Sequence, residues 1–328
     1  MSRMPALALL APAAWLAACS GEQSALAPRG SDAAWIADLA WLLFGGGGVV
    51  LAMVIAALVL SIRGPPAIRA RLARPATMVA AGLFFPIVVL SSLLAYSLWL
   101  TGLTLPVADT GHVLRIEVTG EQWWWRVDYV RPDGSRVASA NELHIPVGQR
   151  IDIVLRSADV IHSFWVPRLG GKVDMIPGRT TRLQLHAEEA GVYRGQCAEY
   201  CGGAHALMAI EVVAVPATAF EAWLARQAEP AVVPASERGR RGQDLFIAAG
   251  CGACHAVRDT SAAVIGPDLT HFGSRRSIGG AMLPMSEQNA ARFIADGQYV
   301  KPGNRMPPFR IFSDDELAAL SAFLVALR

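Results

Sequence analysis

Residues 196–208 read QCAEYCGGAHALM, and this stretch decides how the rest of the chain is interpreted. Cys197, Cys201 and His205 stand four residues apart, and Met208 follows three residues later. Thiolate, imidazole and thioether groups are soft ligands, which favour copper over hard cations. A loop that brings these four side chains together therefore predicts a copper site.

The number of ligands predicts two copper ions rather than one. One blue-copper ion uses one cysteine, two histidines and a weak axial methionine. Because His162 lies upstream in VIHSFWVP (residues 160–167), this chain offers two cysteines, two histidines and a methionine. Two thiolates can bridge a pair of ions, which leaves one histidine for each ion. Met208 then completes one shell, and a backbone carbonyl between the cysteines completes the other.

Two other uses of these ligands are weaker. A disulfide between Cys197 and Cys201 is chemically reasonable in an oxidising compartment, but it leaves His162, His205 and Met208 without a role. A zinc site with two cysteines and two histidines has no use for Met208.

Outward from this loop, residues 105–217 show the two-residue periodicity of β-strands. Apolar and polar side chains alternate over residues 112–119 and again over residues 151–155. Turn signals such as Pro-Asp-Gly at 132–134 and Pro-Gly at 177–178 separate the strand-length segments. The pattern predicts an all-β domain, an antiparallel sandwich or barrel.

Residues 35–104 are expected to form a two-helix transmembrane hairpin. Hydrophobic residues make up 53% of the chain and charged residues 17%, and long uncharged runs cause this bias. Trp35–Ile62 and Thr77–Leu103 each exceed the ~20 residues that cross a bilayer. The loop at residues 63–76 has four arginines and no acid, which predicts that it is cytoplasmic and that everything after residue 104 is exported. A buried soluble hairpin would show a polar face, which these segments lack.

Residues 1–18 are typical of a lipoprotein-type signal peptide. After one early arginine and an apolar stretch, Leu16-Ala-Ala-Cys19 resembles the bacterial lipobox, in which the cysteine is acylated. Residues 19–34 would then form a periplasmic N-terminal segment with lipid on Cys19. An ordinary signal peptide cut near Ala18, with an incidental thiol, is the alternative.

A second redox module is expected at residues 237–328, after a helix and linker at residues 218–236. Cys251-Gly-Ala-Cys254-His255 is the attachment signature of c-type haem, in which both thiols bond to the haem and the histidine binds its iron. A thioredoxin-like redox pair is the alternative, but no βαβ pattern surrounds the motif and a histidine follows it directly.

The sixth iron ligand is predicted to be Met306. A thioether ligand raises the potential of an electron-carrying haem. Met306 lies about fifty residues after the attachment motif, in GNRMPPF (residues 303–309), and is followed by a predicted helix over residues 314–327. This arrangement resembles the class I cytochrome c pattern. Met282 and Met285 are rival ligands, but they lack the flanking Pro-Pro and the following helix.

Together these features resemble subunit II of haem–copper cytochrome c oxidases, with its binuclear copper (CuA) domain and a fused cytochrome c domain, as in caa-type oxidases. Besides the copper loop and both membrane helices, the resemblance rests on QWWW (122–125), HSFWVP (162–167) and KVDMIPGR (172–179). It implies a multidomain fold: a transmembrane α-helical hairpin, an all-β cupredoxin sandwich and an all-α class I cytochrome c domain.

The same resemblance implies roles for several further residues. Glu199 would supply the backbone carbonyl to copper, and its side chain would reach a magnesium ion at the boundary with subunit I. Asp174 and Arg179 would belong to the face that docks on that subunit. Trp123 would be the point where electrons enter, although a ring that only fills space under the copper loop is the alternative. The Pro267 carbonyl would orient the haem-binding histidine.

The implied function is that of a bacterial respiratory cytochrome c oxidase subunit. Electrons from a cytochrome c-type donor would pass through its haem and copper pair to subunit I, where oxygen is reduced to water and protons are pumped. Expected partners are subunit I, subunit III, the donor and membrane lipid. The formal charge of +2 and the lack of a Lys/Arg-rich stripe give no sign of nucleic-acid binding. The chain would cross the bacterial inner membrane twice, with both redox domains on the periplasmic side.

Two other functions remain open at this point. A free electron shuttle, or a domain like the copper domain of nitrous-oxide reductase, would need only one membrane anchor. A copper-delivery or sensor protein would need no covalent haem. Co-purification with a large multispan haem protein in mild detergent would distinguish the oxidase from both.

Overall fold

The computed structural model describes residues 21–104, 115–232 and 234–328. The predicted signal peptide, with Cys19, lies outside these residues. The described chain divides into two compact units, one within Ala34–Leu105 and the other made by the remaining residues.

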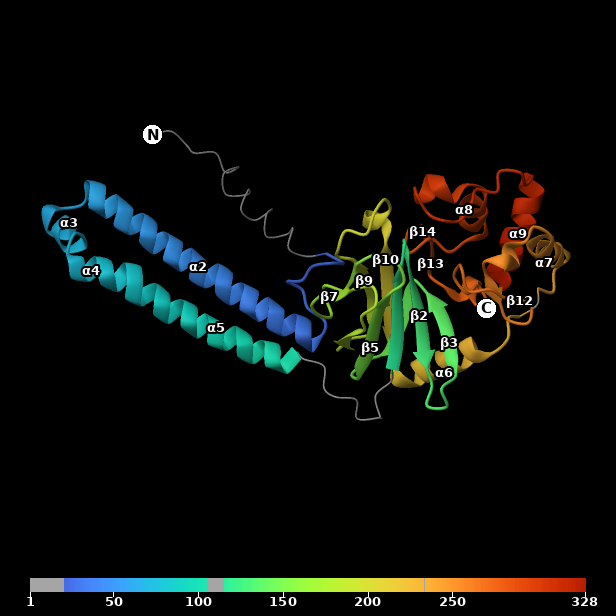
Figure 1. Ribbon diagram of the computed structural model, residues 1–328, viewed down its shortest axis with the longest axis horizontal. Helices are drawn as coiled ribbons and strands as arrows, with labels where there is room; N and C mark the ends of the chain where they lie inside the picture. The colour runs from blue at the N-terminus through green and yellow to red at the C-terminus, as the bar shows by residue number, and fades with distance from the viewer. Residues whose placement is uncertain (1–20, 105–114, 233) are drawn as a thin grey trace, which may run out of the picture. The chain divides into compact units, whose positions relative to one another are not determined.

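The first unit is a helical hairpin. The chain runs out along one long helix, turns, and returns along a second (Figure 1). Its elements are α2 (Ser31–Arg63), α3 (Pro66–Leu72), α4 (Pro75–Val79), the π-helical η1 (Ala80–Phe84) and α5 (Phe85–Thr104). The most apolar 18-residue windows of the two long segments have mean hydropathies of 2.5 and 2.3, and none of the residues in these windows is buried in the protein. Length and exposed apolar surface both fit insertion into a membrane.

The second unit begins with a β-sandwich. One sheet has the strand order β3-β2-β1-β5-β8 and the other β4-β10-β9-β6-β7. The strands are β1 (Arg115–Glu121), β2 (Trp124–Val130), β3 (Arg136–Ala140), β4 (Glu142–Pro146), β5 (Arg150–Ser157), β6 (His162–Trp165), β7 (Val173–Met175), β8 (Thr181–His186), β9 (Gly191–Cys197) and β10 (Ala209–Val215).

The sandwich confirms the predicted β class, but its sheets are not wholly antiparallel. β1 pairs with β5, and β4 with β10, in parallel. The sequence periodicity marks strands and their buried faces, but it carries no information on strand direction. Trp125, Tyr129 and Phe164 are fully buried and are the largest side chains of the core between the sheets.

The helix α6 (Ala217–Ala228) closes one side of the sandwich core. Its side chains Phe220 and Trp223 pack against Tyr129, and the Trp223 ring stacks on His144 with 4.0 Å between ring centroids. The helical spacing of Phe220 and Trp223 in the sequence therefore reflects burial against the sandwich.

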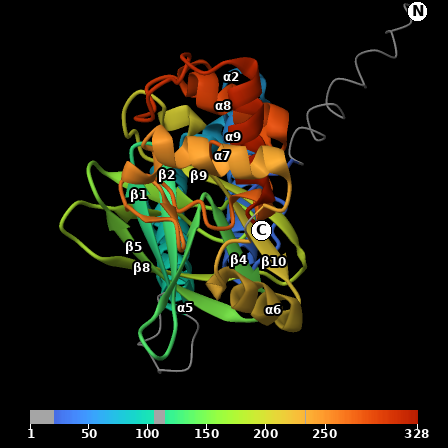
Figure 2. The same ribbon diagram turned by 90° about the vertical axis from the view of Figure 1, so that its right-hand side faces the viewer.

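A short 3-10 helix, η2 (His205–Leu207), lies between β9 and β10, and the elements after α6 form the helical domain shown in Figure 2. They are α7 (Glu237–Ala248), η3 (Cys251–Ala253), β11 (Ala256–Val257), β12 (Ser261–Ala262), η4 (Phe272–Ser274), β13 (Ser277–Ile278), β14 (Leu283–Pro284), α8 (Glu287–Val300) and α9 (Asp314–Ala326). The helices α7 and α9 approach closely at Gly242, where a Cβ atom would lie 2.0 Å from the Ala319 carbonyl oxygen. Only glycine fits there. A capping box between Ser313 and Glu316 begins α9.

A charge cluster outside the core gives a test of the sandwich. The Glu117 side chain on β1 is 9% exposed and lies 2.7–3.0 Å from Arg115, Arg136 and Arg156. Burial opposes its ionisation, but the three guanidinium groups outweigh burial and hold the pKa of this carboxyl below 4.5.

We predict that Glu117→Gln lowers the free energy of unfolding by about 1–2 kcal/mol at pH 7, because three partly exposed ion pairs are lost. The difference in unfolding free energy between the variant and the wild type should vanish as the pH falls through the folded-state pKa of Glu117. The reason is that a carboxyl group with a lowered pKa stabilises the fold only while it is ionised. Denaturant unfolding of the detergent-solubilised chain measures both effects. Glu221→Gln, an exposed carboxyl on α6, is the control; an equal loss there would contradict the prediction.

Candidate functional site

Three strand ends in one sheet bring the predicted copper ligands together. The strand β9 lies between β6 and β10 and is antiparallel to both, so the end of β9 lies at the same edge of the sheet as the starts of β6 and β10. His162 begins β6, Cys197 ends β9, and Met208 directly precedes β10. The Cys197 N–H donates to the Met208 carbonyl at 2.9 Å, which closes the loop between them.

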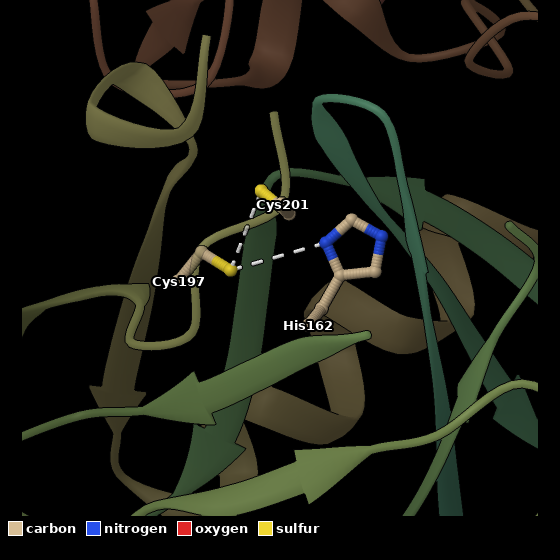
Figure 3. A group of neighbouring side chains, drawn as sticks. All are labelled: His162, Cys197 and Cys201. Atoms are coloured by element: carbon tan, nitrogen blue, oxygen red, sulfur yellow. Dashed lines mark hydrogen bonds between the residues drawn. The ribbon is translucent and has the colours of Figure 1, made fainter. Parts of the chain in front are cut away.

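The five side chains converge on one small volume. Figure 3 shows His162, Cys197 and Cys201 turned toward one another. The Cys197 Sγ lies 3.8 Å from His162 Nδ1 and 3.7 Å from Cys201 Sγ. The Cys201 Sγ lies 3.5 Å from His205 Nδ1 and 3.9 Å from Met208 Sδ.

The donor set and its electrostatics fit copper. Both cysteines are free and buried, so no disulfide competes for the sulfur atoms. The hydrogen bond between the two thiols lowers the pKa of Cys197 and raises the pKa of Cys201. Cys197 is therefore the thiol that ionises more readily, and the positive charge of a bound metal would favour ionisation of both.

Asp159 holds His162 in the orientation that the site needs. Its Oδ1 accepts from His162 Nε2 at 2.8 Å, which leaves Nδ1 facing the sulfur atoms. Although burial opposes protonation, the hydrogen bonds to Cys197 and Asp159 raise the pKa of His162. Asp159 was not among the site residues predicted from the sequence. Its only signal is an acidic residue three positions before the histidine.

Two glycines let the backbone come close to these ligands. A Cβ at Gly120 would lie 2.8 Å from the His162 ring. Gly202 has a φ of +106°, and a Cβ there would lie 3.0 Å from Gln122 Nε2 and 3.2 Å from the Trp123 ring. These positions have no room for a side chain.

Between the helical domain and the β-sandwich, an apolar cavity of about 300 Å³ has the predicted haem residues on its wall. Cys251, Cys254 and His255 all line it. His255 Nδ1 donates to the Pro267 carbonyl at 2.8 Å, which agrees with the expected orienting role and leaves Nε2 available to iron. A Cβ at Gly266 would lie 2.7 Å from the His255 ring. The cavity and its residues fit a covalent haem.

Met306 is the methionine on this cavity wall. Met282 and Met285, also in the described part of the chain, are not among the lining residues. Asn304 and Gln298 hold the loop: Asn304 Oδ1 accepts from the Met306 N–H at 2.9 Å, and Gln298 Nε2 donates to the Met306 carbonyl at 3.2 Å.

Trp123 lies between the predicted copper ligands and the residues of the haem-type cavity. Its Nε1 donates to the Cys201 carbonyl at 3.0 Å, and its ring lies 3.4 Å from the position of a Cβ at Gly303. Arg305 Nη2 donates to Gln122 Oε1 at 2.9 Å and lies 3.4 Å from Asp159 Oδ2. The indole of Trp123 therefore contacts both the loop that carries the predicted copper ligands (residues 197–208, the copper loop) and the loop that carries Met306.

The other residues with predicted roles, Glu199, Asp174 and Arg179, lie on the outer side of the copper loop. The Glu199 carbonyl lies 3.2 Å from Cys197 Sγ, while the Glu199 side chain is 45% exposed. Lys172 Nζ lies 3.2 Å from Asp174 Oδ1 and 3.8 Å from Glu199 Oε2. Arg179 follows on an exposed turn after β7. These side chains form a charged surface beside the loop.

Comparison with known proteins assigns the family. The model described as "Cytochrome C oxidase subunit II, periplasmic domain" matches residues 130–215, and the model "Cytochrome c" matches residues 239–328. Cytochrome c oxidase subunit 2 of Alkalihalophilus pseudofirmus is 33% identical over 328 residues, which cover 96% of this chain and 94% of the relative. The chain belongs to the cytochrome c oxidase subunit II family.

Two further similarities cover parts of the chain. Cytochrome c oxidase subunit 2 of Bacillus subtilis is 32% identical over 246 residues, 69% of this chain and 68% of the relative. The crystal structure of the periplasmic domain of subunit II from Bradyrhizobium japonicum is 34% identical, with a TM-score of 0.34, and covers 38% of this chain and 96% of that one.

As a subunit II with a cytochrome c domain, the chain is the electron-accepting subunit of a haem–copper oxidase and has an oxidoreductase role. Its two domain families imply copper and haem. It works with the other oxidase subunits and a cytochrome c donor, and its two apolar helices insert it in the membrane. The predicted fold class is confirmed in all three parts.

We predict that Asp159→Asn weakens copper binding about 10- to 100-fold, because the loss of a charged partner loosens His162. Copper titration of the copper-free chain, followed by its optical spectrum, measures the change. Asp133→Asn removes a carboxylate from the exposed β2–β3 turn and should leave copper binding unchanged. Unchanged binding in Asp159→Asn would show that the aspartate does not support the ligand.

Proposed function

We propose that this subunit holds a binuclear CuA centre and one covalent haem c. When bound, these groups would supply one-electron carriers between a cytochrome c-type donor and subunit I. The haem would come first and the copper pair second. In subunit I, oxygen is reduced to water and protons are pumped. The residues of this chain hold the groups, orient their ligands and separate them from solvent.

The proposed copper ligands are two bridging thiolates, one histidine for each ion, a thioether and a carbonyl. They are Cys197 and Cys201, His162 and His205, Met208, and the backbone of Glu199. The convergence of these atoms within 3.2–3.9 Å contacts supports the assignment. Soft donors of this number exceed what one copper ion uses.

The proposed haem ligands come from two different segments of the cytochrome domain that line one cavity. Cys251 and Cys254 would attach the haem, and His255 and Met306 would bind its iron. Burial lowers the pKa of His255, which keeps the imidazole neutral and able to bind metal. The cavity wall formed by these four residues supports the assignment.

The observation that carries the electron path is the position of Trp123. Its indole N–H donates to the Cys201 carbonyl at 3.0 Å, while its ring lies 3.4 Å from the position of a Cβ at Gly303, three residues before Met306. We propose that Trp123 receives electrons from the tethered cytochrome domain and passes them toward the copper loop.

The outer face of the copper loop is proposed to meet subunit I. Glu199 presents an exposed carboxylate, which suits a magnesium ion at that boundary. Asp174 and Arg179 would contact the same subunit. Subunit III would complete the complex, and the chain would span the bacterial inner membrane with both redox domains in the periplasm. Lipid on Cys19 would add an anchor, which the intact mass of the mature chain tests.

Metal and haem quantitation tests the cofactor assignment. The full chain in detergent should contain two coppers and one covalent haem, and its spin-resonance spectrum should show a mixed-valence copper pair. One copper per chain, or zinc in its place, would rule out the binuclear centre. A chain without covalent haem would rule out the electron path through it.

We predict that Trp123→Phe slows electron transfer from haem to copper at least tenfold, because the variant loses the indole N–H that bonds the Cys201 carbonyl. Flash reduction of the haem, followed at the copper absorption band, measures the rate. Trp124→Phe is the matched control, because the Trp124 ring stacks with Arg126 and does not bond to the copper loop. Equal rates in the two variants would contradict the role of Trp123.

A further inference from the structure

Lys301 is a buried cation without an acidic partner in the described chain. It follows α8 and is 3% exposed. Its Nζ donates to the Gly279 carbonyl at 3.0 Å, and no ion pair involves it among the described residues. Burial lowers the pKa of Lys301 to about 8, so the ammonium form still predominates at neutral pH. The chain has one other lysine, Lys172, which is exposed.

The cavity that Lys301 lines has an excess of positive charge. Arg275 and Arg305 line it too, and the one carboxylate on the wall, Glu121, is paired with Arg126 at 2.7 Å. A buried charge is costly unless an opposite charge or several hydrogen bonds compensate it. A cavity with this charge is suited to an anionic occupant.

Of the three lining cations, Lys301 is the most deeply buried, whereas Arg275 is half-buried and Arg305 is exposed. Arg305 is engaged by Gln122 and Asp159, and Arg275 donates to the Asp268 carbonyl. An ammonium group has three donors, and the Gly279 carbonyl accounts for one. The other two donors of Lys301 are available at the cavity wall.

A tight turn holds Lys301 at the wall that borders the copper domain. Gly279, Gly280 and Ala281 have φ values of +70°, +78° and +59°. A Cβ at Gly280 would lie 3.4 Å from Lys301 Nζ and 3.2 Å from the Ala209 carbonyl oxygen. Glycine is required there, because both neighbours are close and the backbone is left-handed. The ammonium group is thus held beside the strand that follows Met208.

We propose that Lys301 is the counter-ion of a haem propionate, at the part of the haem cavity that borders the copper domain. This inference rests on the proposed covalent haem, whose two propionates are the anionic groups that such a cofactor brings into the cavity. The ammonium charge next to the haem favours its reduced form, so Lys301 sets the haem potential as a positioning residue and does not bind iron.

Redox titration of the haem in the full detergent-solubilised chain tests the inference. Lys301→Gln keeps a hydrogen-bond donor and removes the charge, and it should lower the equilibrium constant for haem reduction about tenfold, which is about 59 mV for one electron. Lys301→Arg keeps the charge and should stay within about threefold of the wild type. Arg238→Gln removes a cation that is 62% exposed and paired with Glu287, and it should change nothing.

The outcomes separate the inference from the function on which it rests. Wild-type chain without covalent haem would overturn the proposed function. Haem-loaded Lys301→Gln with an unchanged potential, or with the same shift as Lys301→Arg, would overturn the inference alone. If Lys301→Gln fails to load haem but Lys301→Arg loads it, the result supports a requirement for the positive charge. If both variants fail to load haem, Lys301 has a packing role, and the inference is overturned.

Discussion

The pairing of β6, β9 and β10 is the constraint on which the copper site depends. Antiparallel pairing places the start of β6 beside the end of β9, and so brings His162 to Cys197 across 35 residues of chain. The Cys197 N–H bond to the Met208 carbonyl closes the loop that presents Cys201. Because backbone hydrogen bonds of a buried sheet hold these ends, the ligands are positioned before any metal is present.

The residues around Trp123 join this site to the cytochrome domain. Gln122 and Trp123 both donate to the Cys201 carbonyl, at 2.8 and 3.0 Å. Asp159 accepts from the Gln122 N–H and from His162, and Arg305 of the Met306 loop reaches the same carboxylate. One small hydrogen-bond network therefore supports the proposed copper ligand His162, the proposed electron acceptor Trp123 and the loop that carries Met306.

Much of the organisation was predictable because each motif combines unusual chemistry with fixed spacing. The hairpin, the β-domain and the helical haem domain all follow from local patterns. The prediction of a purely antiparallel sandwich was wrong for β1–β5 and β4–β10, because residue alternation does not encode strand direction. Asp159 was missed because an acidic residue in a loop has no distinctive pattern before its neighbours in space are known.

The sequence alone determined which donor groups the chain offers to a metal and a haem: two cysteines, two histidines and a methionine in one domain, and a haem-attachment motif with a distant methionine in the other. The metal preference of a ligand depends on the type of residue, so it can be inferred without a structure. The tertiary structure decided what surrounds those ligands: the Asp159 contact, the place of Trp123 between two loops, and the burial of Lys301. These depend on contacts between residues far apart in the chain, which only packing brings together.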